Sequence, residues 1–376
     1  MSAIPMAGLR LRFCTDPGEF LAAAGDHLAA DPVVSTVLTT VAHHVLSQRA
    51  AGISQPDRDW WLVVRDESGA VVGAGMRTAP FAPYPPYLLP MPDEAAVALA
   101  SALHERGEEV LGVNGALPAV ELFAAELARL GGGHVEVGQH TRLHELGELV
   151  QPASVPGGLV VATEEDVDLV LEWFAAFMGD ADEQAGRPRG VSAHDVPDRA
   201  EMLRRLRAGR LWFWVDETGQ PVHLTGANPP SFGVARVGPV YTPPAQRGRG
   251  WASNAVAEVS RRIQAEGARV CLFTDQANPT SNKIYAALGY RPVVDMANLV
   301  IVRLTPNESR LEADREHPAI ATLDAALPGN LPTPTPAPTG RHDPPSGSIP
   351  DHRKRTTAAS GRHAPGPPGE GIGRSR

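Results

Sequence analysis

The sequence is short of cysteine and of long apolar runs, and each shortage excludes a class of protein. The 376 residues include two cysteines, Cys14 and Cys271, which are too few for a disulfide framework or a cysteine-based metal site. No apolar run approaches the roughly 18 residues of a membrane-spanning helix, and the N-terminus lacks the apolar core of a signal peptide. We therefore expect a cytoplasmic protein that binds no metal and contacts no membrane.

Basic residues are also fewer than acidic ones. Lys and Arg number 34 against 43 Asp and Glu, which gives a formal net charge of −9. Because proteins bind nucleic acids largely by placing basic side chains on phosphates, this balance argues against a nucleic-acid partner. The 43% hydrophobic and 20% charged residues are ordinary for a soluble globular protein, and the length allows two domains and a tail.

Residues 328–376 differ in composition from the rest of the chain. They are rich in Pro, Gly, Ser and Arg and almost lack large apolar side chains. Such a segment cannot bury enough surface to offset the entropy that it would lose on ordering. We expect a disordered tail, in which the run "HRKR" is either a solvated basic segment or a contact for an acidic partner.

Residues 157–305 alternate between strand-like and helix-like patterns, which predicts an α/β domain with a mixed sheet. Apolar residues recur at helical spacing over 164–180, and "DETG" between two apolar runs is typical of a hairpin. Asn278 and Pro279 suit the N-cap and first position of a helix that ends at Gly289. The other elements expected are strands at 157–163, 232–242, 269–274, 290–295 and 298–304 and a helix at 251–266.

A short loop at residues 246–252, "QRGRGWA", has the composition of a phosphate-binding site. It precedes a predicted helix, whose first turn leaves N–H groups without internal partners and carries partial positive charge. Gly248 and Gly250 allow a ligand to approach the backbone closely, and Arg247 and Arg249 add charge suited to phosphate oxygens. Because glycine–arginine turns are common, a plain basic turn is the alternative.

A tyrosine lies in the helix after the next strand. Tyr285 shares a helix face with Ile284 and Leu288. If the strands at 232–242 and 269–274 are parallel, both following helices start at the sheet edge where α/β proteins bind ligands. The Tyr285 hydroxyl could then give a proton to a leaving thiolate. A core aromatic with a hydrogen-bonded hydroxyl is the alternative.

The first 150 residues repeat the same order more weakly. "DESG" lies between two apolar runs as "DETG" does, and similar helix and strand patterns follow. We expect residues 1–150 to be a second, degenerate copy of the fold, with an unrelated α/β domain as the alternative. The stretch "YLLPMPDEAAV", at the position of the glycine-rich loop, has no glycine and two acids, so no phosphate binding is expected there.

Together, "VYTPPAQRGRGWA" and "NPTSNKIYAALGYRPV" resemble the GCN5-related N-acetyltransferase (GNAT) superfamily over residues 157–305. Arg247, Gly250 and Ala252 fill the family's R-x-x-G-x-G/A pattern, and the whole chain resembles tandem members with one degenerate copy. The resemblance implies the acyl-CoA N-acyltransferase fold. It also implies direct transfer of an acetyl group from acetyl-CoA to a primary amine of a small molecule or amino acid, without an acyl-enzyme.

The resemblance further assigns roles to residues. The backbone at residues 240–242 would pair with the pantetheine arm, and the N–H groups of residues 247–252 would hold the pyrophosphate. Asn278 would contact the coenzyme or fix a water, and Tyr285 would be the general acid. The implied acetyl-CoA-binding residues are Val240, Tyr241, Thr242, Arg247, Gly248, Arg249, Gly250, Trp251, Ala252 and Asn278.

The general base and the acceptor site are not evident. Many family members place a glutamate on the strand before the loop, but this strand has none. His223 and Asp275 are the nearest suggestions, and a water chain or an already neutral amine are others. The missing base leaves open a non-catalytic CoA-binding sensor or scaffold protein, and the oligomeric state is not indicated.

An acidic stretch at the start of a polar loop, 179–198, either meets a cationic amine or is merely solvated; its acids are Asp180, Asp182 and Glu183.

Overall fold

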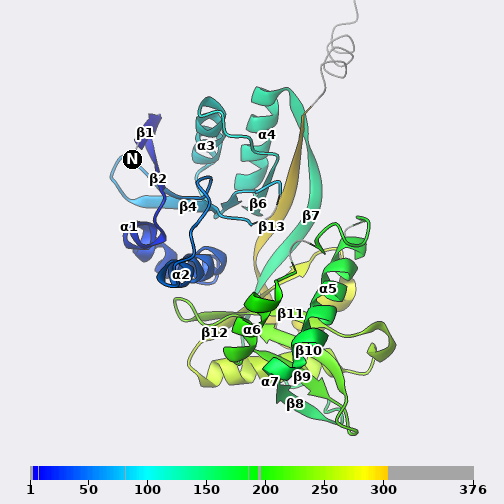
Figure 1. Ribbon diagram of the computed structural model, residues 1–376. Helices are drawn as coiled ribbons and strands as arrows, with labels where there is room; N and C mark the ends of the chain where they lie inside the picture. The colour runs from blue at the N-terminus through cyan, green and yellow to red at the C-terminus, as the bar shows by residue number, and fades with distance from the viewer. Residues whose placement is uncertain (1–2, 7, 81, 185, 194–195, 304–376) are drawn as a thin grey trace, which may run out of the picture. The chain divides into compact units, whose positions relative to one another are not determined.

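The described residues form one sheet flanked by helices (Figure 1). The strand order is β1-β2-β3-β4-β5-β6-β13-β7-β12-β11-β10-β9-β8, and parallel and antiparallel pairs both occur, which confirms the predicted mixed sheet. All these strands fall within one compact unit, Met1–Ala319. The predicted tail at 328–376 lies outside the described residues. The computed structural model describes residues 3–6, 8–80, 82–184, 186–193 and 196–303.

The same succession of elements occurs twice, which confirms the predicted duplication of the fold. In each half a strand is followed by two helices, three strands, a helix, a strand, a helix and a final strand. After β1 (Ala3–Met6), the first half contains β2 (Leu9–Cys14), α1 (Pro17–Ala30), α2 (Thr36–Ala50), β3 (Trp60–Arg65), β4 (Val71–Arg77), β5 (Tyr87–Leu88), α3 (Asp93–Glu105), β6 (Gly112–Ala116), α4 (Ala119–Gly131) and β7 (Gly133–Leu146). The second half contains β8 (Gly158–Val161), α5 (Val167–Gln184), α6 (Arg199–Arg207), β9 (Leu211–Val215), β10 (Pro221–Ala227), β11 (Val234–Tyr241), α7 (Trp251–Ala265), β12 (Arg269–Asp275), α8 (Pro279–Ala287) and β13 (Tyr290–Arg303).

The two halves exchange their last strands. Strand β13 lies between β6 and β7, and β7 lies between β13 and β12; Figure 1 shows β7 and β13 as two long neighbouring strands. The end of β7, residues 141–145, pairs with residues 275–271 of β12. Each half therefore obtains an inner strand of its sheet from the other half.

Local sequence signals explain where several helices begin and end. The side chains of Asp16, Asp198 and Asn278 each accept a hydrogen bond from the backbone N–H three residues later, which satisfies a donor that helix geometry leaves free. Gly132 ends α4 in the left-handed conformation with φ of 67°. The predicted N-cap role of Asn278 is thus confirmed.

The two faces of the second half pack against different helices. On one face Ala235 and Val237 of β11 belong to a core cluster with Val256 of α7. On the other face Val234 and Cys271 belong to a cluster that includes residues of α2 in the first half. Side chains of β11 therefore face either α7 or the side of the sheet that packs against the first half, depending on their position along the strand.

Two predicted boundaries are wrong. The strands expected at 290–295 and 298–304 are one strand, β13, because register irregularities accommodate the break in pattern without a turn. The loop expected at 179–198 begins as helix, since α5 continues to Gln184. Ion pairs and hydrogen bonds of the acids in this last turn stabilise the extension.

Candidate functional site

Strands β11 and β12 pair over only part of their length. They run parallel from Val234, opposite Arg269, to Val237, opposite Leu272, as the sequence argument required. Beyond that point β11 continues along β10 and β12 continues along β7. Among the described residues, the β11 edge groups that would face β12 are therefore left without ladder partners and can pair with an extended ligand.

The loop after β11 leads into α7 with exposed amides. A short 3₁₀ turn is followed by Gly248 and Gly250, whose φ values of 77° and 81° are left-handed. Gly250 is the N-cap of α7 and supplies no side-chain cap. The first helical bond runs from the Asn254 N–H to the Gly250 carbonyl, so within the described part of the chain the N–H groups of residues 251–253 have no acceptor. These amides and the helix dipole favour an anion.

The two arginines of the loop have different environments. Arg247 Nε donates to the Thr242 carbonyl oxygen at 3.0 Å, and its guanidinium pairs with Asp180 of α5. Arg249 is exposed and forms no ion pair with a described residue. Arg249 is therefore the loop cation that is available to a phosphate in this arrangement, whereas Arg247 ties the loop to α5.

The other predicted acetyl-CoA-binding residues of this region pack around the loop. Tyr241 is buried, with its ring 6.0 Å from that of Trp173 on α5. Trp251 is buried in a cluster with Trp214, so its side chain is a packing group and its backbone N–H is the part that faces the anion position. The half-buried members are Val240, Thr242 and Ala252.

Asn278 and Asp275 stabilise the turn before α8. The Asn278 amide donates to Gln184 of α5 at 2.9 Å while its oxygen caps α8. The Asp275 carboxylate accepts from the Ala277 N–H at 2.8 Å and from the Gln139 amide at 2.9 Å. Both side chains are therefore engaged in local structure at the carboxyl end of β12.

Tyr285 is a residue of α8 whose side chain packs in the core. Its side chain is 8% exposed, and its ring meets that of Tyr290 edge-on with centroids 5.9 Å apart. The Tyr290 hydroxyl bonds to Ser260 at 2.7 Å, whereas the Tyr285 hydroxyl has no hydrogen-bond partner among the described residues. Burial raises the pKa of Tyr285 above its ordinary value, so the phenol keeps its proton and is a donor.

His223 is a structural histidine. It is fully buried, with Nδ1 2.7 Å from Thr242 Oγ1 and Nε2 2.6 Å from Thr225 Oγ1. Burial lowers its pKa to about 3. A neutral imidazole with both nitrogens occupied holds β10 against the end of β11 and is poorly placed to take a proton from a substrate.

The acids expected to face an amine are already paired. Asp182 is fully buried; burial alone would raise its pKa, but hydrogen bonds, those from Ser192 foremost, lower it to about 2. Asp180 and Glu183 both pair with Arg189. In this arrangement the three carboxylates brace the end of α5, and none is free for a cationic amine.

Sequence reasoning overlooked Arg236. This residue lies in β11 between Ala235 and Val237, and its Nη1 is buried without a partner among the described residues. The signal available in the sequence was a charged residue inside the apolar run "VARV", at the start of the strand that leads to the loop.

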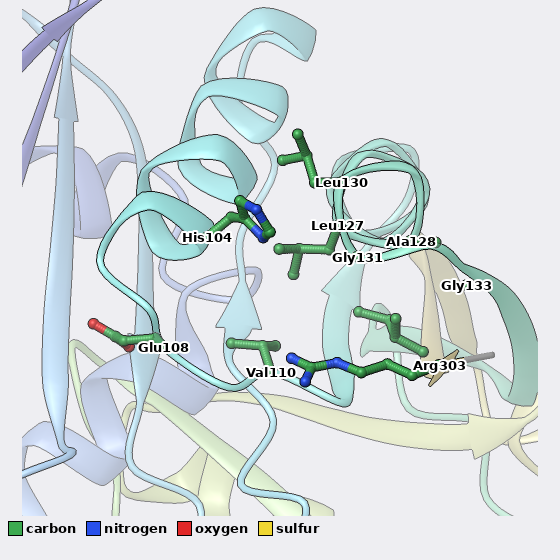
Figure 2. Close-up of a pocket in the computed structure, with 10 residues that line it drawn as sticks. His104, Glu108, Val110, Leu127, Ala128, Leu130, Gly131, Gly133 and Arg303 are labelled. Carbon is green, nitrogen blue, oxygen red and sulfur yellow. The ribbon is translucent and has the colours of Figure 1, made fainter. Parts of the chain in front are cut away.

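The first half has no equivalent loop. Helix α3 begins at Asp93 after Pro92, and its first turn carries Asp93 and Glu94, which repel an anion. A hollow of about 290 Å³ in this half is lined by the ends of α3 and α4; Figure 2 shows His104 and Leu127 beside it. It includes none of the predicted acetyl-CoA-binding residues.

Neither a metal cluster nor a membrane-spanning helix occurs in the part of the chain that the structure describes. No three His, Cys, Asp or Glu side chains gather closely enough to hold an ion. No helix is both long and apolar enough to cross a bilayer.

Comparison with known proteins concerns both the loop region and the whole fold. Residues 232–298 match the family model described as FR47-like protein. A solved Drosophila protein is similar at 14% identity and a TM-score of 0.54, covering 78% of this chain and 99% of that one. A GCN5-related N-acetyltransferase from Sphaerobacter thermophilus is similar at 16% identity and a TM-score of 0.50, covering 80% and 98%. A tandem GNAT protein from the clavulanic acid biosynthesis pathway matches at 16% identity and a TM-score of 0.48, covering 79% and 99%. No curated protein sequence matches this chain.

Proposed function

We propose that this chain is a member of the GNAT superfamily, whose fold it shares, and that it transfers an acetyl group from acetyl-CoA to a primary amine of a small molecule or amino acid. One observation carries the proposal: the free edge of β11 is followed, after the glycine-containing loop at 242–250, by the uncapped start of α7. Strand-edge groups followed by unpaired amides suit a long ligand that has an amide-bearing arm and a diphosphate.

The groups present fit acetyl-CoA. The backbone of residues 240–242 would pair with the pantetheine arm, and the amides of residues 247–252 would bind the pyrophosphate, with Arg249 adding charge. A Cβ on Gly250 would lie 3.0 Å from Val155 Cγ1, which is tighter than ordinary contact, so the absence of a side chain keeps this corner open. Arg247 would join the phosphate only by exchanging its bond to Asp180.

The proposed reaction needs two proton movements. The amine attacks the thioester carbonyl carbon, the carbon–sulfur bond breaks, and the sulfur receives a proton as it leaves. Tyr285, which burial keeps protonated, would supply that proton. A strand amide near Thr242 would donate to the carbonyl oxygen as negative charge develops there.

The proton that the amine loses would leave through water, or the amine would bind already neutral. His223 does not suit the role of base, because burial lowers its pKa to about 3 and two threonine hydroxyls occupy its nitrogens. Asp275 is committed to the turn before α8. Neither residue is part of the proposed mechanism.

Acetyl-CoA binding and amine-dependent thiol release test the proposal. Titration calorimetry measures binding of acetyl-CoA, and a thiol-reactive dye follows CoA release over a panel of primary amines and amino acids. We expect binding together with release that depends on the amine. Binding without turnover on any amine would instead favour a non-catalytic CoA-binding protein, and no binding at all would contradict both functions.

Gly250→Asp tests the anion site itself. A carboxylate at the N-cap of α7 would occupy the place of the diphosphate and repel it, so CoA affinity should fall at least about 10-fold. Gly267→Asp is the matched control, because Gly267 follows the other end of α7 with a similar φ of 82° and open space around it. Equal affinities for the two variants would remove the proposed diphosphate site.

A further inference from the structure

Arg236 is the last charged residue before β11 and β12 separate. It is paired in register with Cys271, and the parallel ladder ends one residue later. Its neighbours Ala235 and Val237 face α7, so its side chain lies on the opposite face of the sheet. Its guanidinium carbon is 6.0 Å from the centroid of the Phe273 ring.

The guanidinium has no counter-ion in the part of the chain that the structure describes. Nη1 of Arg236 is buried and unpaired. Two other arginines also have a buried unpaired nitrogen, but Arg12 pairs with Glu19 and Arg210 pairs with Glu266. Arg236 forms no such ion pair with any described carboxylate.

The surroundings of Arg236 are aromatic and apolar. Burial lowers the pKa of its guanidinium, and Coulombic interactions with Cys271 and Tyr87 partly oppose that shift. Because a partly buried cation without an anion is unfavourable, an anionic ligand would stabilise this side chain. The residue as a whole is half-buried, not fully buried, which leaves a ligand a route to it.

The diphosphate of acetyl-CoA is not the matching anion. The amides proposed for it follow β11 at the start of α7, whereas Arg236 lies further back on the strand and on the face away from α7. Tyr241, the last residue of β11, also faces away from α7 and packs in the cluster of α5. Arg236 and Tyr241 therefore both face away from α7, five residues apart along β11.

We propose that the acceptor is an amino acid or another amine that carries a carboxylate, and that Arg236 binds this carboxylate. The planar fork of a guanidinium matches the two oxygens of a carboxylate. Phe273 and Tyr87 provide apolar walls that exclude water and strengthen the pair. This inference rests on the proposed acetyl transfer and specifies the substrate class of the same site.

The test compares matched acceptors on two variants. The twenty L-amino acids and their C-terminal amides are assayed for CoA release with the wild-type protein, Arg236→Met and the control Arg210→Met. The control removes another arginine with a buried unpaired nitrogen, one that pairs with Glu266 after the end of α7. For the wild type and the control we expect the best amino acid to exceed its amide in kcat/KM by about 100-fold or more. Arg236→Met should abolish that preference while acetyl-CoA affinity stays within about 2-fold. An equal rate for acid and amide in the wild type, or a preference that survives in Arg236→Met, would overturn the proposal.

Two measurements keep this test separate from that of the transferase activity. Calorimetric titration of the CoA-saturated protein with the same acids and amides reports the carboxylate preference without turnover, so its loss in Arg236→Met supports the proposal even if no amine is acetylated. Thermal melting reports the role of Arg236 in folding. Arg236→Met should melt at or above the wild-type temperature because it removes an uncompensated buried charge; a large decrease would show a structural partner and overturn the proposal.

Discussion

The rings of Tyr285 on α8 and Tyr290 on β13 meet edge to face, and their hydroxyls differ in their partners. Tyr290 bonds to Ser260, whereas Tyr285 has no partner among the described residues. Burial raises the pKa of both, so ionisation does not distinguish them. The difference in partners is what makes Tyr285 the better proton donor to a ligand.

Exchanging each tyrosine for phenylalanine tests this difference. Tyr285→Phe should lower kcat about 100-fold because the leaving sulfur loses its proton donor, while CoA affinity remains near normal. Tyr290→Phe removes one buried hydrogen bond and should cost about 1 kcal/mol of stability with little change in kcat. Steady-state kinetics and urea unfolding measure both quantities, and full activity in Tyr285→Phe would reassign the general acid.

His223 gives a prediction about pH. Its pKa is lowered from 6.5 to about 3 in the folded state, so between these values the unfolded chain binds a proton that the folded chain refuses. The contribution of His223 to the free energy of unfolding is therefore fully present above pH 6.5. It declines by about 1.4 kcal/mol per pH unit as the pH falls from there toward the folded-state pKa. Urea unfolding of His223→Gln should show a shallower decline below about pH 6.5 than the wild type. Thr225→Val, which keeps the histidine, should retain the wild-type dependence of the unfolding free energy on pH.

At the scale of elements, the end of α8 is tied to the end of β7. The Gly289 carbonyl accepts from the Gly147 N–H at 3.1 Å, and a Cβ on Gly289 would lie 2.1 Å from the Glu148 carbonyl oxygen. Gly289 has φ of 98°. A side chain here would both strain the backbone and push α8 away from the segment that joins the two halves.

Gly289→Ala and Gly267→Ala separate these two effects. Gly267 has φ of 82° and no atom near its missing Cβ, so its alanine variant should lose about 1–2 kcal/mol from the left-handed backbone alone. Gly289→Ala should lose a further 1–3 kcal/mol or so, because the overlap with Glu148 forces a backbone shift. Equal unfolding free energies for the two variants would show that the contact is not restrictive.

Elements were predicted from sequence where the local signal was strong. Asn278 and Pro279 located the start of α8, and the apolar spacing before Gly267 located α7, because caps and helical periodicity act within a few residues. The continuity of β13 was missed, since its irregular register is defined by pairing with β7 from the other half. The end of α5 was missed for a similar reason: Asp180 and Asp182 are stabilised in the helix by arginines that follow it.

At the scale of the whole molecule, the exchange of β7 and β13 links the two halves. Strand β12 has β7 as its neighbour on one side, and Leu143 of β7 is fully buried in the cluster that joins both halves. A fragment confined to residues 157–305 would lack β7 and expose an edge of β12. We therefore expect that residues 1–150 and 157–305 are two distinct copies in the sequence but that neither folds independently of the other.

Separate production of these fragments tests the expectation. Fragments 1–150 and 157–305 should each aggregate or lack a cooperative thermal transition, because an unpaired inner strand is exposed. Their co-expression should give a soluble complex that melts cooperatively. Circular dichroism and size-exclusion chromatography provide the readout, and a monomeric, cooperatively melting fragment 157–305 would show that the exchanged strand is dispensable.

The sequence by itself determined the fold class, the duplicated order of elements and the glycine-rich entry to α7, because periodicity, caps and turn residues depend on near neighbours in the chain. Tertiary structure alone decided which strand completes each half, why Arg247 is bonded to Asp180, and why Arg236 has no anion beside it among the described residues. These three features depend on side chains and strands that are distant in sequence, and only the folded chain sets their distances, burial and charge balance.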